Sequence, residues 1–115
     1  MVVSTNYISG YRIKDTLGFT YGLVVRSRGL GGNIIASLRT IFGGEIREYT
    51  ELLNEARQNA LDRLIEHAKS MGANAVINVR FDSSEIGASM SEIIAYGTAV
   101  VIERDDKEPG AVRLV

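Results

Sequence analysis

The chain has 115 residues, of which 45% are hydrophobic, so it is long enough for one folded domain and too apolar for a disordered polymer. It contains no cysteine, which excludes disulfides, thiolate metal sites and a thiol nucleophile. The chain has 13 basic and 14 acidic residues, which gives a net charge of -1. A nucleic-acid-binding protein usually carries an excess of basic residues, so this balance argues against that function.

No run of about 18 apolar residues occurs, and residues 1–6 resemble no secretory leader, so we expect neither a membrane span nor a signal peptide. These expectations place the protein in the cytoplasm. We expect one domain over residues 1–104 and a flexible tail over residues 105–115, which contain the only proline and Gly110.

Residues 11–25 alternate in hydrophobicity with the two-residue period of a β-strand. The odd positions are mostly apolar, and we expect them to form the buried face of this strand. Gly18 and Gly22 fall among the polar even positions, where a missing side chain permits a bulge or the close approach of another backbone. A short edge strand over residues 2–5 is expected to precede it.

A glycine-rich loop over residues 26–33 leads into a short amphipathic helix over residues 34–42, which Asn33 can cap and Gly43-Gly44 ends. A longer helix is predicted over residues 46–71, because its apolar residues recur at intervals of three and four and Gly72 follows. That helix would be about 39 Å long, longer than the ~30 Å breadth of a compact chain of this size.

Two strands are predicted over residues 75–82 and 93–102, joined by a loop over residues 83–91 that favours antiparallel pairing. The last strand is apolar or small on both faces. We expect one sheet face to lack cover within the chain, including Ile93, Ala95, Ala99 and Val101. Exposed apolar surface of this extent indicates an interface, so a homo-oligomer is predicted.

The run from Gly18 to Val101 resembles the YbjQ-like family, whose members carry a heavy-metal-binding label. The resemblance rests on an ordered set of short motifs: Leu17-Gly18, the loop Arg26 to Ile34, Gly43-Gly44, Tyr49, Ala56-Arg57, Ala60, Gly72 to Val76, Val79-Arg80 and Tyr96 to Val100. It implies an α+β fold with a β-α-β-β subunit similar to the dodecin subunit, in which a mainly antiparallel sheet packs on one long helix. It also implies assembly into pentameric rings, and no known reaction.

The glycine-rich loop is the first candidate binding site. Backbone N–H groups at a helix N-terminus, with arginines beside them, can hold a small anion. The alternative is a permissive turn whose arginines pair with a neighbouring subunit, and the loop matches neither a P-loop nor a dinucleotide fingerprint. The candidate residues are Arg26, Arg28, Gly31, Gly32 and Asn33.

The turn between the two helices is the second candidate. Gly43 and Gly44 suffice as a helix-ending turn, although a backbone without side chains also lets a small molecule approach. Tyr49 and Arg57 are eight residues apart on the long helix and face similar directions, so they either line a small pocket near these glycines or anchor a subunit interface.

Catalytic and metal-ligating patterns are weak. His67 is the single histidine, and we interpret it as a partly exposed surface residue, because a metal site would need ligands from another chain. No motif presents a serine or threonine as a nucleophile, so we assign no catalytic residue, no metal ligand and no cofactor. Only a ring of symmetry-related carboxylates could hold a hard cation.

Three functions remain open from the sequence. A small oligomeric binding or assembly protein without a catalytic set is favoured, with itself and a small anion as partners and neither nucleic acid nor membrane. A metal-binding ring that uses inter-subunit carboxylates is the alternative. An enzyme with an inter-subunit cleft is the third, and the sequence leans against it.

Overall fold

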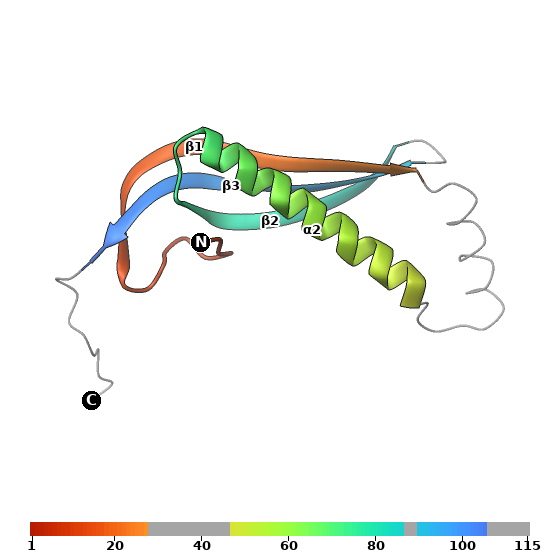
Figure 1. The fold of residues 1–115 in the computed structure, drawn as a ribbon, viewed down its shortest axis with the longest axis horizontal. Coiled ribbons are helices and arrows are strands. Elements are labelled where there is room, and N and C mark those ends of the chain that lie inside the picture. Colours follow the sequence, from red (N-terminus) through yellow and green to blue (C-terminus); the bar gives the residue numbers. More distant parts are fainter. Residues whose placement is uncertain (28–46, 87–89, 106–115) are drawn as a thin grey trace, which may run out of the picture.

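The computed structural model describes residues 1–27, 47–86 and 90–105 and shows an α+β fold with the expected β-α-β-β order (Figure 1). Its elements are β1 (Tyr11–Ser27), α2 (Arg47–Ser70), β2 (Ala75–Ile86) and β3 (Met90–Arg104). The predicted helix over 34–42, its Asn33 cap, the Gly43-Gly44 turn and residues 106–115 lie outside the described residues. No helix in the described ranges is both long enough and apolar enough to span a bilayer.

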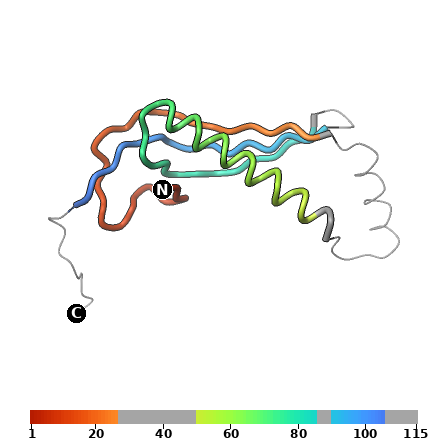
Figure 2. The backbone as a smooth tube through the Cα atoms, viewed as in Figure 1, coloured from red at the N-terminus to blue at the C-terminus, as the bar shows by residue number. Residues whose placement is uncertain are grey.

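The three strands form one antiparallel sheet in the order β1-β3-β2 (Figure 2). The expected pairing of the last two strands is confirmed. Both strands are longer than predicted, however, so that the expected loop over residues 83–91 is strand up to Ile86 and again from Met90. Ser83 and Ser84, which fall in the expected loop, pair with Ile93 and Glu92 of β3.

Helix α2 confirms the predicted long helix. Its buried stripe consists of four residues at most 3% exposed, spaced four apart: Ala56, Ala60, Leu64 and Ala68. The helix ends in a Schellman motif, in which the amide of Ala73 donates to the carbonyl of Ala68 at 3.0 Å and that of Gly72 to Lys69 at 2.9 Å. Gly72 has the positive φ of 92° that this ending requires.

The helix backbone rests directly on β1 at Gly22. A Cβ atom at this position would overlap the carbonyl oxygen of Ala60 and the backbone nitrogen of Leu64. The predicted close approach of another backbone is therefore confirmed. The predicted bulge is confirmed as well, because Gly18 has a φ of 123° and the pairing of β1 with β3 shifts register between Thr16 and Gly18.

Tyr11 and Leu17 are half-buried and pack against the cores as predicted, but beyond the bulge, from Phe19 to Val25, the predicted buried face of β1 is wrong. Thr20 and Val24, at even positions beside Gly22, are 0% and 4% exposed, whereas Phe19 and Tyr21 are 60% and 46% exposed. The helix packs on the even face because small residues there let it come close, although the odd face is the more apolar one.

The uncovered sheet face was also assigned to the wrong residues of β3. Ile93, Ala95 and Ala99 were expected to lack cover, but they are at most 7% exposed and belong to the core under α2. Val101 is half-buried. The face without a helix carries the alternate residues of β3, such as Ile94 and Tyr96, which pair with odd residues of β1.

The N-terminal segment, residues 1–10, covers part of this second face and the outer edge of β2. The predicted edge strand over residues 2–5 appears as a parallel bridge between Val2 and Val76. Asn78 has the left-handed φ of 55° and lies at an irregularity in the pairing of β2 with β3. There the amides of Asn78 and Val79 donate to the carbonyls of Thr5 and Val3 in the N-terminal segment. A second core forms here from Ala75, Ile77, Val100 and Ile102, with Val3, Ile8 and Tyr11 packed against it.

The first described turns of α2 extend beyond the sheet (Figure 1). Residues 51–55 are all exposed, including Leu52 and Leu53 at 46% and 40%. This agrees with the expectation that one copy of the sheet is too small to cover the whole helix.

The contact at Gly22 yields a first prediction. Replacing Gly22 with Ala should lower the free energy of unfolding by about 2–3 kcal/mol, because the new methyl group forces α2 away from β1. The matched control is Gly10→Ala, where no atom lies within 4 Å and only a φ of 79° opposes the substitution. Urea unfolding followed by circular dichroism measures both, and equal losses would contradict the close packing.

Candidate functional site

One surface that the fold leaves uncovered is the helix-free face of the sheet at the end far from the N-terminal segment, which we call the open face. Directly paired residues of antiparallel strands share a face, so Tyr21 lies beside Tyr96 and Leu23 beside Ile94. The four residues from β1 are 36–60% exposed. The open face consists of Phe19, Tyr21, Leu23 and Val25 from β1 with Ile94 and Tyr96 from β3.

Aromatic rings gather at the centre of the open face. The ring centroids of Phe19 and Tyr21 are 5.7 Å apart, and those of Phe19 and Tyr96 are 6.3 Å apart. The hydroxyl of Tyr96 lies 3.4 Å from Oδ2 of Asp82 on β2, which gives the cluster a polar border. Large rings with few rotatable bonds and a polar border are typical of protein interfaces.

His67 connects this aromatic cluster to the helix. The ring centroids of His67 and Tyr21 are 5.3 Å apart. The two rings can meet although Tyr21 lies on the open face, because β1 is the edge strand of the sheet. The Nδ1 atom of His67 lies 2.9 Å from Oγ1 of Thr20, and Thr20 also donates to the carbonyl of Leu64 at 3.1 Å. The predicted partly exposed histidine is thus half-buried, and it helps to fix α2 on β1.

The neighbours of His67 do not form a metal site or a catalytic set. Within residues 1–27, 47–86 and 90–105, no three His, Cys, Asp or Glu side chains gather closely enough to hold a metal ion. Thr20 is fully buried, so its hydroxyl cannot reach a substrate. No local sequence pattern indicates the Thr20–His67 contact, because the two residues are 47 positions apart.

Of the first predicted site, Arg26 alone lies within the described residues. Arg26 lies on β1, with its Nη2 atom 3.7 Å from Oε1 of Glu55 on α2, in an exposed pair that contributes little stability. The pair uses a partner within the chain, whereas the sequence suggested an anion or a neighbouring subunit. Outside the described residues lie Arg28, Gly31, Gly32, Asn33, Gly43 and Gly44.

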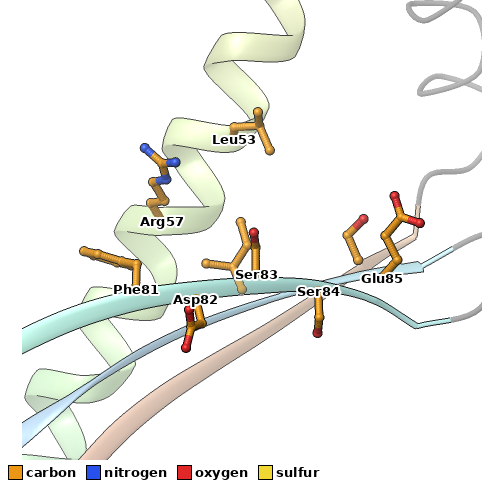
Figure 3. A pocket seen from close by; sticks show the side chains of 9 residues that line it. Leu53, Arg57, Phe81, Asp82, Ser83, Ser84 and Glu85 are labelled. Atoms are coloured by element: carbon orange, nitrogen blue, oxygen red, sulfur yellow. The ribbon is translucent and has the colours of Figure 1, made fainter.

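Of the two helix residues in the second predicted site, Tyr49 lies in α2 without a described side chain, and Arg57 lines a pocket of about 330 Å³. The pocket lies between α2 and the β2–β3 hairpin, with Phe81 and Ser83 on the side of β2 that faces the helix and Asp82 and Ser84 on the opposite side (Figure 3). Leu53, Glu85, Ser91 and Ile93 complete the lining.

Sequence reasoning missed the sheet side of this pocket. Phe81 lies 24 residues beyond Arg57 along the chain, and only the packing of α2 on the sheet brings the two together. The available signal was limited to Phe81 in an alternating strand and the serines that follow it.

Comparison with known proteins gives a consistent match. The YbjQ family model, described as "Putative heavy-metal-binding", matches residues 1–103. A UPF0145 protein from Methanocella arvoryzae is 65% identical over 114 residues, which cover 99% of this chain and 95% of that protein. A UPF0145 protein from a Bradyrhizobium species is 64% identical over 103 residues, covering 90% of this chain and 93% of that protein.

A solved structure shares the fold. The crystal structure of a DUF74-family protein from Pediococcus pentosaceus superposes with a TM-score of 0.54 and 17% sequence identity, covering 90% of this chain and 97% of that one. At this level of identity the likeness concerns the fold alone, and it agrees with the β-α-β-β architecture.

The contact between Thr20 and His67 yields a second prediction. Thr20→Val keeps the shape of the buried side chain and removes its hydroxyl, so Nδ1 of His67 loses a partner and the free energy of unfolding should fall by about 1 kcal/mol. Thr16→Val, at an exposed position of the same strand, is the control and should have little effect. Urea denaturation curves compare the two variants, and similar curves for both would argue against a stabilising hydroxyl.

Proposed function

The chain belongs to the YbjQ family, and we propose that it acts as a homo-oligomeric assembly and binding protein whose open face is covered by another copy of the same chain. The observation that supports this proposal most directly is the exposure of Phe19, Tyr21, Leu23 and Val25, at 60%, 46%, 36% and 47%, on one side of one strand. Single exposed apolar residues are ordinary in proteins, whereas a contiguous row of this kind marks an interaction surface.

The long helix supports the same proposal. Leu52 is 46% exposed in the first described turns of α2, where the helix extends past its own sheet, so a neighbouring copy has a second apolar surface to cover. Two separate apolar surfaces on one subunit favour a closed ring over a simple dimer, because each subunit of a ring uses two different surfaces. Five copies, as the resemblance to YbjQ-like proteins implies, is the ring that we propose.

An enzymatic function has less support. Across the described ranges, the only histidine is bonded to Thr20, a residue with 0% exposure. Threonine and serine hydroxyls need an accessible position and an adjacent base to act as nucleophiles. We therefore propose binding and assembly rather than catalysis, in a cytoplasmic protein.

Metal binding is the second candidate function, and the description of the family model favours it. With no cysteine and one histidine per chain, a soft metal would find too few ligands in a single subunit. A ring can repeat one carboxylate around its axis, so the metal that suits this alternative is a hard cation such as Ca²⁺ or Mg²⁺.

The proposal of self-assembly yields a third prediction. Light scattering at micromolar concentration should give a mass several times the 12.6 kDa of one chain. Phe19→Ser with Leu23→Ser should weaken association by about 30-fold or more, as expected when central apolar residues of an interface are lost. Tyr7→Ser removes an aromatic residue that is 61% exposed outside the open face and should leave the mass unchanged. A parent protein that runs as a monomer would refute the proposal.

The small number of side chains that could bind a soft metal ion yields a fourth prediction. Titration calorimetry of chelator-treated protein with zinc and copper should show no sub-micromolar binding, because each chain offers one imidazole and no thiolate. His67→Ala serves as the comparison. Tight binding of one metal ion per subunit that disappears in His67→Ala would establish the soft-metal site that we do not expect.

A further inference from the structure

We propose that the pocket between α2 and the β2–β3 hairpin binds a small organic monocarboxylate. In this proposal the carboxylate pairs with Arg57, and the apolar body of the ligand packs on Leu53 and Phe81 (Figure 3). The volume of about 330 Å³ lies within the range of roughly 300–1,000 Å³ that is usual for small-molecule sites.

The walls of the pocket are apolar side chains that remain accessible. Phe81 is 43% exposed and Leu53 is 40% exposed, although both residues line the pocket. Ile93, at 7%, belongs to the core beneath them. A ligand with an aromatic or aliphatic body would remove the two exposed side chains from water, which is the main source of affinity in such sites.

Arg57 provides the charge. Among the described residues, no ion pair or hydrogen bond involves its side chain, in contrast to Arg26, which pairs with Glu55, and Arg63, which donates to the carbonyl of Leu23. A guanidinium group offers a planar fork of donors that matches the two oxygens of a carboxylate. A cation without a partner beside two accessible apolar walls is suited to a carboxylate with an apolar body.

The acidic residues of the lining limit the ligand to one negative charge. Asp82 lies on the opposite side of β2 from α2, and its Oδ2 atom is 3.4 Å from the hydroxyl of Tyr96 (Figure 3). Glu85 lies on the helix side, further along β2 toward the end of the hairpin. Arg57 is the one cationic side chain that the described residues contribute to the lining, so phosphate and other multiply charged anions would meet repulsion that one arginine does not offset. The hydroxyl of Ser83 adds a neutral hydrogen-bonding group.

This proposal goes beyond self-assembly and does not depend on it. Every described lining residue comes from a single chain. Apart from Asp82 and Ser84, the lining residues lie on the helix side of the sheet, whereas the open face is on the other side. A monomeric protein could therefore bind the ligand, and an oligomer could lack it. The measured mass and the measured affinity test the two proposals separately.

The experiment uses the full-length protein at pH 7 and three probes: benzoate, benzyl alcohol and inorganic phosphate. Calorimetric titration should show saturable binding of benzoate. Benzyl alcohol, which has the ring without the charge, and phosphate, which has the charge without the ring, should each bind at least about tenfold more weakly, since a charge-assisted hydrogen bond and the apolar contact both contribute.

Arg57→Gln should raise the dissociation constant of benzoate by about tenfold or more, and Arg57→Lys should raise it less, because lysine keeps the charge and loses the fork. The control is Lys69→Gln, which removes one positive charge from the same helix outside this pocket. It should change the dissociation constant of benzoate less than about twofold, because exposed charges beyond the ~10 Å Debye length are screened. Arg57 is exposed, so circular dichroism should show that its variants fold.

Absence of benzoate binding, an unchanged dissociation constant of benzoate in Arg57→Gln, or equal binding of benzyl alcohol or phosphate would overturn the proposal.

Discussion

The contact between the backbone of α2 and the backbone of β1 at Gly22 determines the rest of the structure. Because a hydrogen atom stands where other residues have a side chain, the carbonyl of Ala60 and the amide of Leu64 come against the strand. This proximity buries Thr20 and brings its hydroxyl within reach of Leu64 and His67. It also decides which side of the sheet is covered, and the strand residues on either side of Gly22 are left on the side without a helix.

The side without a helix is divided between two environments. At one end the N-terminal segment covers it, with Val3 and Ile8 packed on the second core, and hydrogen bonds from the same segment occupy the outer edge of β2. At the other end the open face has no cover in the described part of the chain. The edge of β1 is partly occupied by Arg63, which donates to the carbonyl of Leu23. The open face therefore remains a contiguous row of exposed apolar residues, which is the kind of surface that marks an interface.

The two sides of the sheet support different proposed roles. The open face is apolar and aromatic, which suits contact with another protein surface. The pocket on the helix side combines Arg57 with exposed apolar walls and suits a small ligand. Since the pocket and the open face lie on opposite sides of the sheet, a subunit can use both at once.

The sequence alone determined the long helix, the antiparallel pairing of the last two strands, the fold class and the family. The spacing of Ala56, Ala60, Leu64 and Ala68 predicted the helix, Gly72 predicted its end, and Gly18 and Gly22 predicted a bulge and a close approach. These features depend on neighbours within a few residues, so local pattern is enough to find them. Arg57 was also identified from the sequence, through its position on the helix.

Only the tertiary structure decided which face of β1 is buried and what lies opposite Arg57. Hydropathy favoured the odd face of β1, because glycine and threonine carry no apolar signal, yet the small even residues are the ones that admit the helix. An apolar strand face can pack within its own subunit or against another subunit, and the alternating sequence pattern is the same in both cases. The Thr20–His67 contact and the Arg57 pocket join residues far apart in the chain, so the packing of α2 on the sheet fixes them and local sequence does not.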